Sequence, residues 1–189
     1  MALLTLKQRK EYFNKLGLGE YTKANILKFQ KKYFTRKIDQ DGIYGNNTDK
    51  LLRHVYNCSQ VRNFAPLEFK CDCGGKYCTG YPDYMKSRTL QFMQRIRDYV
   101  GKPVTVTSGL RCRTQNKIDG GVANSKHLTG KAVDYYIAGI TISLSGRKKL
   151  INTIKKWDGH DYSYCDGWDS DEYKRYSSTM GTAIHTQTK

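Results

Sequence analysis

The sequence predicts an α+β fold in two parts, and three observations support this. Residues 1–60 contain three short segments with apolar residues at helical spacing. Residues 61–189 contain one long amphipathic segment followed by alternating, β-branched segments with short connections. Helices followed by strands, rather than alternating with them, favour a mainly antiparallel sheet with helices on one face. We therefore expect a three-helix domain over 1–60 and a small sheet-containing domain over 61–189.

The first two helices have recognisable ends. Thr5 followed three residues later by Gln8 is a capping-box pattern, and Gly17 and Gly19 end the first helix. A second helix is expected after Thr22, with apolar residues at helical spacing. Both predictions rest on local patterns alone.

The third helix follows a turn. Asp41-Gly42 is a turn signal, and either Asn46 or Asn47 is expected to cap the helix that follows. The segment 57–66 has no clear period, so we place the linker between the two domains there. Ile43, in the turn, is expected to pack into the helix bundle.

The second part contains the predicted sheet. Asp83 is expected to cap a helix that runs to about Tyr99. The remaining elements are predicted as strands over 104–107, 131–138, 162–165 and 182–188 and a helix over 145–157.

One stretch carries the pattern of a metal site. His127 lies just before a Thr-Gly turn and Asp134 lies in the strand that follows, so the chain can fold back and bring both side chains to one point. Imidazole nitrogen and carboxylate oxygen are both good zinc donors. His185 lies in the last predicted strand, where antiparallel pairing would place it beside Asp134, and we take it as the third ligand. His54 and His160 are expected to be surface or hydrogen-bonded histidines.

These residues belong to a longer pattern, Ser-x-His-x-x-Gly-x-Ala-x-Asp over 125–134. It is preceded by Thr-Ser-Gly-Leu-Arg at 107–111 and followed by Ala-Ile-His at 183–185. These three motifs, in this order along the chain, resemble those of the family of zinc D-Ala-D-Ala carboxypeptidases and L-alanyl-D-glutamate peptidases. The resemblance covers roughly residues 67–189. The resemblance implies zinc held by His127, Asp134 and His185, with a water activated for attack on an amide carbonyl. It also implies that Arg111 reaches the substrate carbonyl or carboxylate.

The general base is unassigned. Members of this family usually place an Asp or Glu a few residues before the last histidine, and here that position is Thr182. Related lysins often carry an acidic residue two positions after the histidine, where this chain has Gln187. Acidic candidates lie upstream at Asp161, Asp166, Asp169, Asp171 and Glu172. A non-catalytic peptidoglycan-binding protein with a degenerate peptidase fold is therefore the alternative to an enzyme.

The first part has a resemblance of its own. Phe29-Gln30 and the turn from Asp41 to Gly45 are similar to the three-helix peptidoglycan-binding domain of wall hydrolases. Tyr44 in this turn either stacks on sugar or packs in the domain. The two resemblances together imply a phage-type endolysin that hydrolyses an amide bond in the peptide part of peptidoglycan, as endopeptidase or D,D-carboxypeptidase, with the binding module holding it near its substrate.

Six cysteines are more typical of free thiols or metal ligands than of disulfides in a chain made in the cytosol. Cys71, Cys73 and Cys78 lie close together, and Cys112 is available as a fourth ligand. Zinc sites normally show paired C-x-x-C motifs, and this spacing is irregular, so a second, structural metal is not expected.

The net charge of +16 indicates a polyanionic partner. The basic residues are spread along the chain rather than gathered in one arm, which favours anionic wall polymers over nucleic acid. The first residues lack the apolar core of a signal peptide, and no segment is apolar enough to span a membrane. We expect a monomer that is made in the cytoplasm of a bacterial host, binds no nucleic acid, does not insert into membranes, and acts on the wall after release.

Overall fold

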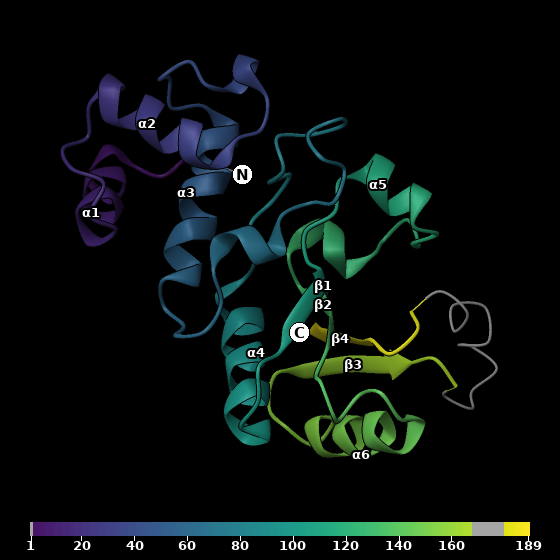
Figure 1. Cartoon of the computed structure of the whole chain (residues 1–189). Coiled ribbons are helices and arrows are strands. Elements are labelled where there is room, and N and C mark those ends of the chain that lie inside the picture. Colours follow the sequence, from purple (N-terminus) through teal and green to yellow (C-terminus); the bar gives the residue numbers. More distant parts are fainter. Residues whose placement is uncertain (1, 168–179) are drawn as a thin grey trace.

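The structure is a computed structural model that describes residues 2–167 and 180–189. Three helices precede a four-stranded antiparallel sheet with further helices around it (Figure 1), which confirms the predicted α+β class. The elements are α1 (Leu6–Lys15), α2 (Lys23–Tyr33), η1 (Lys37–Asp39), α3 (Asn46–Cys58), η2 (Pro66–Phe69), α4 (Ser87–Val100), β1 (Thr105–Ser108), α5 (Arg113–Ile118), η3 (Lys126–Thr129), β2 (Ala132–Tyr136), α6 (Leu144–Ile154), β3 (His160–Cys165) and β4 (Ile184–Thr188). No helix within the two described ranges is both long and apolar enough to cross a membrane.

The caps of the first two helices are as predicted. The Thr5 hydroxyl accepts from the Gln8 backbone N–H at 3.3 Å while the Gln8 side chain accepts from the Thr5 N–H at 2.9 Å. The Thr22 hydroxyl accepts from the backbone of α2 in the same way. For α3 the predicted cap is wrong: Gly45 caps the helix and Asn46 is its first residue. Gly45 has the extended backbone of a cap, and its carbonyl already accepts the first helical hydrogen bond.

The turn before α3 is organised by a buried glutamine. The Gln30 carbonyl oxygen accepts from the Gly42 N–H at 2.7 Å, and its amide nitrogen lies 3.0 Å from the Ile43 carbonyl and from the Asp41 carboxylate. This network holds the Ile43 backbone, so its side chain points away from the bundle and is 62% exposed. The prediction that Ile43 packs inside is therefore wrong. Tyr44 packs against the core in its place.

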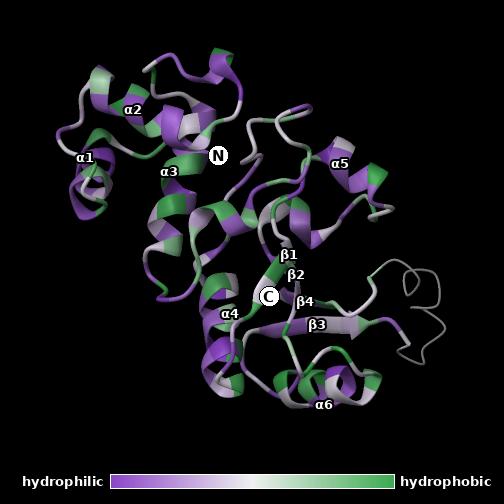
Figure 2. Ribbon diagram, viewed as in Figure 1, coloured by the Kyte–Doolittle hydropathy of each residue, from purple (hydrophilic) through white to green (hydrophobic). Residues whose placement is uncertain are grey.

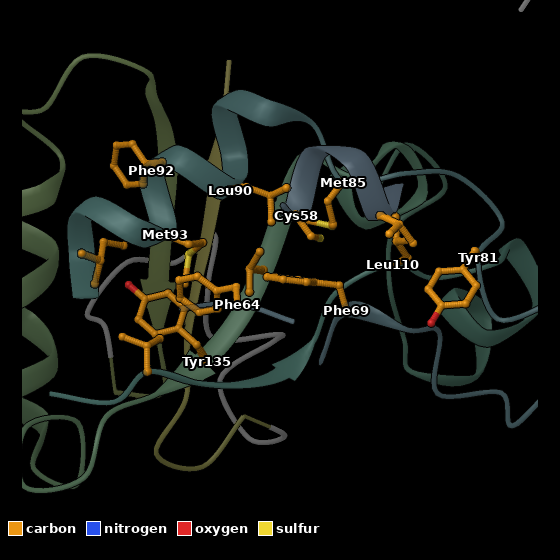
Figure 3. Packing of buried hydrophobic residues seen from close by; sticks show 14 of the residues in the cluster. Cys58, Phe64, Phe69, Tyr81, Met85, Leu90, Phe92, Met93, Leu110 and Tyr135 are labelled. Carbon is orange, nitrogen blue, oxygen red and sulfur yellow. The ribbon is translucent and has the colours of Figure 1, made fainter. Parts of the chain in front are cut away.

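Helix α3 connects the N-terminal helices to the rest of the chain. His54 is fully buried; its Nε2 lies 2.9 Å from the Pro66 carbonyl, and its Nδ1 accepts from the Met85 N–H at 3.2 Å. His54 is thus a hydrogen-bonded histidine, as expected. A single hydrophobic cluster runs from Leu4 to Ile184, and Figure 3 shows Phe64 and Phe69 within it. The cluster contains residues from both sides of the predicted domain boundary at residue 60. The division into two domains stays a prediction.

Helix α4 begins later than expected. Asp83 does not cap it; its carboxylate accepts from the Tyr84 N–H at 2.7 Å and pairs with Lys86 instead. The helix is amphipathic (Figure 2), and its apolar side includes Leu90 and Met93, which are buried. The short helix α5 was not predicted. Its six residues carry no helical repeat long enough to be recognised.

The sheet has the strand order β1-β2-β4-β3, with every neighbouring pair antiparallel. Val133, Tyr135 and Ile184 contribute to the hydrophobic core, which also includes residues of α4 and α6. Thr188 of β4 contacts Thr89 of α4 at 2.8 Å on the same side. Because side chains alternate along a strand, the residues between them face the other side of the sheet. That side, away from α4, carries the polar residues described below.

Burial of His54 predicts a pH-dependent stability. Desolvation lowers the pKa of His54 from 6.5 to about 4. The folded state resists protonation that the unfolded state accepts below pH 6.5, so stability falls as the pH drops from 6.5 toward 4. Between pH 7.5 and pH 5 we expect wild type to lose about 2 kcal/mol more than His54→Gln. Urea unfolding of both proteins at the two pH values measures this, and equal losses would contradict it.

Candidate metal and substrate site

His127 and Asp134 are brought together by a tight turn. His127 lies in η3, which ends at Gly130 with a φ of 67°, and Asp134 lies in β2 immediately after it. A Cβ atom on Gly130 would lie 2.1 Å from the Tyr84 carbonyl oxygen, so both the backbone conformation and the space require glycine. The Thr-Gly turn recognised in the sequence thus places the two side chains on one side of the sheet.

His185 joins them through strand pairing. Asp134 in β2 is directly opposite His185 in β4. The Asp134 Oδ1 lies 2.7 Å from the His185 Nδ1 and 3.3 Å from the His127 Nε2, and the two ring nitrogens are 3.3 Å apart. The three residues predicted as ligands therefore converge, with all three donor atoms within 4.8 Å of one another.

Each histidine has a second contact that orients its ring. The Nδ1 of His127 lies 2.7 Å from the Gly109 carbonyl, which can only accept, so this nitrogen carries the proton and Nε2 keeps a lone pair. The Nε2 of His185 lies 3.4 Å from the Gln187 Oε1, and donation to it leaves Nδ1 facing the centre. Such outer contacts are what fix the ligating nitrogen of a metal-binding histidine. Gln187, two residues after His185, has this role here.

Arg111 is bound to the same carboxylate. Its Nη2 donates to the Asp134 Oδ2, and its Nε donates to the Ser108 hydroxyl at 2.8 Å. Asp119 lies 3.4 Å from the same Nε. The two carboxylate oxygens of Asp134 thus serve different partners, Oδ1 the histidines and Oδ2 the arginine. Ser108 and Asp119 hold the guanidinium in place, a role that the sequence did not predict for either residue.

The charges at the site keep Asp134 ionised. Burial by itself would raise the pKa of Asp134, but His127 and His185 outweigh burial and hold the pKa well below its usual range. Burial lowers the pKa of His127, against the opposing effect of Asp134. The ionised carboxylate is the form of Asp134 that binds a divalent metal.

Two of the three donor separations fit a tetrahedral ion. Zinc bonds of about 2.0 to 2.2 Å place ligand atoms about 3.3 to 3.6 Å apart. Two of the three separations here are 3.3 Å, and the third is 2.7 Å. His127 and His185 are at least nine-tenths buried, and these three residues supply one ligand atom each. The donor set therefore suits one divalent ion with a fourth position left for another ligand.

The other predicted residues lie apart from these donors. His160 begins β3 and its Nε2 lies 3.0 Å from the Ser163 hydroxyl, so it is a hydrogen-bonded histidine. Asp161 accepts from Gln187 at 3.0 Å, and Asp166 accepts from the Gly181 N–H at 2.7 Å. The remaining base candidates, Asp169, Asp171 and Glu172, lie outside the described residues.

Tyr44 is half-buried in the N-terminal part. Its hydroxyl donates to Asp49 at 2.9 Å, the Arg9 guanidinium lies 4.1 Å from its ring centroid, and Tyr21 contacts its edge. These contacts give Tyr44 a packing role. A role in sugar stacking stays a prediction.

Two imidazoles and a carboxylate on one face of a small antiparallel sheet, with an arginine on the carboxylate, are the donor set typical of hydrolytic zinc sites. The family model described as Peptidase M15 matches residues 62–164, more than half of the 189-residue chain. The chain belongs to the Peptidase M15 family.

A curated relative is similar over part of its length. The zinc D-Ala-D-Ala carboxypeptidase of Streptomyces albus G is 33% identical over 123 residues, which cover 61% of this chain and 47% of the relative. The chain thus spans about half the length of this relative.

The shared carboxylate predicts the effect of one substitution on metal binding. Asp134→Asn removes the charge between the two histidines, so zinc should bind more weakly. Loss of contacts in the outer shell alone typically weakens metal binding by about 10- to 100-fold, and loss of this ligand should exceed that. Competition with a zinc-sensitive chelator dye measures the affinity. Asp158→Asn, at a carboxylate just before β3 whose side chain is 88% exposed, is the control and should bind as wild type. Equal affinities for the two variants would contradict the assignment.

Proposed function

We propose that this chain is a zinc-dependent peptidase that hydrolyses an amide bond in the peptide part of bacterial peptidoglycan. The observation that carries the proposal is the convergence of His127, Asp134 and His185, whose donor atoms all lie within 4.8 Å of one another. Membership of the Peptidase M15 family and the similarity to a zinc D-Ala-D-Ala carboxypeptidase support it.

Zinc held by these three residues would supply a Lewis acid that polarises an amide carbonyl and lowers the pKa of water. The protein itself keeps the ligands ready: Gly109 and Gln187 fix the histidine rings, and the carboxylate stays ionised. Little ordering is then required on metal binding.

Arg111 is the residue we assign to substrate. Its guanidinium carries five N–H donors in a planar fork, of which Ser108 and Asp134 engage two. The remaining donors can bind a carbonyl oxygen as negative charge develops on it, or a substrate carboxylate. Because Oδ2 of Asp134 anchors the arginine and Oδ1 faces the histidines, the arginine and the metal ligands hold a fixed relative position.

The residue that accepts the proton from water is unassigned. Its presence or absence distinguishes a peptidase from a non-catalytic wall-binding protein. Thr182 is exposed at the position where the family usually has its acid. Asp161 is linked to the site through Gln187, whose amide donates to it while its oxygen faces His185. A non-catalytic wall-binding protein therefore remains the second candidate, favoured by Thr182, and activity measurements decide between the two.

We further propose that the chain acts as a wall lysin of phage type. The N-terminal helices resemble a peptidoglycan-binding module, which would keep the catalytic part near an insoluble substrate. The net charge of +16 would raise its rate of association with anionic wall polymers. The expected monomeric state, and action on the wall after release from a host cytoplasm, belong to the same proposal.

The activity prediction concerns Arg111. Purified protein should release new amino groups or free D-alanine from peptidoglycan, lose this activity with chelator and regain it with zinc. Arg111→Ala should lower kcat by about 100- to 1000-fold, the usual cost of removing a donor to a developing oxyanion, and retain bound metal. Arg113→Ala, at an exposed arginine two residues on, is the control and should keep wild-type activity. Unchanged turnover in Arg111→Ala would contradict its role, and mass spectrometry of the products identifies the bond.

Binding to cell walls can be measured by sedimentation, separately from activity. Arg111→Ala should still sediment with purified walls as wild type does, since binding does not require turnover. If wild type sediments but releases no product at any zinc concentration, the non-catalytic function is correct. Sedimentation that added DNA abolishes, together with salt-sensitive DNA binding, would instead indicate a nucleic-acid-binding protein.

A further inference from the structure

Four cysteines from two separate segments meet in a small cluster of their own. Cys71, Cys73 and Cys78 lie between η2 and α4, and Cys112 follows β1; we call these four residues the cysteine cluster. Their sulfur atoms all lie within 4.8 Å of one another. Cys71, Cys73 and Cys112 are buried. The irregular spacing of the cysteines led us to expect no second metal. Spacing along the chain does not show, however, that Cys112 lies beside the other three cysteines in the folded protein.

The local backbone is shaped to gather these sulfurs. Gly74 and Gly75 have φ values of 62° and 89°, and the Lys76 N–H donates to the Cys73 carbonyl at 2.9 Å, which forms a tight turn. The Cys71 N–H donates to the Gly80 carbonyl at 2.8 Å and closes the loop. The segment after β1 runs alongside, with the Leu110 N–H donating to the Phe69 carbonyl at 2.9 Å.

The sulfurs are placed as acceptors. Backbone N–H groups donate to Cys71 Sγ from Cys112 at 3.3 Å, to Cys78 Sγ from Gly80 at 3.3 Å, and to Cys112 Sγ from Gln115 at 3.4 Å. Hydrogen bonds of this kind favour the thiolate, which is the form that binds metal. Three of the four sulfurs are therefore supported by backbone donors.

The separations match a metal site better than a disulfide. Sulfur atoms bound to one zinc at about 2.3 Å in a tetrahedron lie about 3.8 Å apart. The Sγ atoms of Cys73 and Cys78 are 3.4 Å apart, far longer than the S–S bond of about 2.05 Å. All six cysteines of the chain are free thiols in the structure.

We propose that the cysteine cluster binds one zinc ion as a closed structural site with four thiolate ligands. Four protein ligands leave no position for water or substrate, so this ion would not take part in hydrolysis. It would be separate from the ion held by His127, Asp134 and His185.

The position of the site indicates what it stabilises. Cys112 directly follows Arg111, so a metal at the cluster would hold the segment that presents this arginine to Asp134. The same loop touches the N-terminal part: a Cβ atom on Gly75 would lie 3.0 Å from Thr35, and Lys70 donates to the Thr35 hydroxyl at 2.6 Å. The ion would tie the N-terminal helices, the cysteine loop and the arginine segment together.

Zinc stoichiometry tests the proposal independently of activity. Wild-type protein purified under reducing conditions should carry two zinc ions per chain by native mass spectrometry. Asp134→Ala should keep one, Cys112→Ser and Cys73→Ser should each keep one, and the combination with Asp134→Ala should keep none. Cys165→Ser, at a buried cysteine of β3 outside the cluster, is the matched control and should keep both.

Cobalt substitution identifies the ligands. The cobalt form of Asp134→Ala should show sulfur-to-cobalt charge-transfer absorption, and adding Cys73→Ser should abolish it. The charge-transfer absorption of Asp134→Ala shows thiolate ligation without any substitution in the cysteine cluster. The test therefore holds even if the cysteine variants fail to fold. If the proposed peptidase function is wrong, the protein will show no activity, but zinc will still be bound at the cysteine cluster. The two proposals can therefore fail separately.

Two results would overturn the proposal. One is a wild-type chain with a single zinc that Asp134→Ala removes entirely. The other is thiol titration of unreduced, denatured, chelator-treated protein that finds four thiols rather than the six present in the sequence, since a disulfide removes two.

Discussion

The pairing of Asp134 with His185 across β2 and β4 is the constraint on which the rest of the structure depends. Because side chains alternate along a strand, this register sends Val133, Tyr135 and Ile184 into the core and the two polar residues to the opposite face. A slip of one residue would reverse both sets at once. Burial of apolar side chains therefore enforces the register that brings the candidate ligands Asp134 and His185 together.

The second constraint is the buried charge of Asp134. A buried carboxylate is costly unless it is paired, and here its two oxygens have separate partners, the histidines on one side and Arg111 on the other. Asp119 and Ser108 in turn hold the arginine. This division joins Arg111 and the three candidate metal ligands into a single unit, as the proposed function requires.

Contacts between the two parts of the chain extend this unit. His54 of α3 bonds to the segments before and after the cysteine loop, through Pro66 and Met85. Lys70 and Gly75 contact Thr35 from the same loop. The N-terminal helices thus pack against the segment that leads to the candidate metal site, and both share one hydrophobic cluster.

The sequence by itself determined the features that depend on neighbours along the chain. The caps at Thr5 and Thr22 and the turn at Gly130 are local, and the resemblance carried by 125–134 supplied His127 and Asp134. Only the tertiary structure showed that Asp119 and Ser108 hold Arg111, that Gln187 orients His185 and that Ile43 is exposed. It also showed that the sulfur of Cys112, which the sequence offered as a fourth ligand, lies close to those of the other three cysteines. These contacts join segments whose spacing carries no period, and their partners are set by strand register and loop packing, which no local pattern encodes.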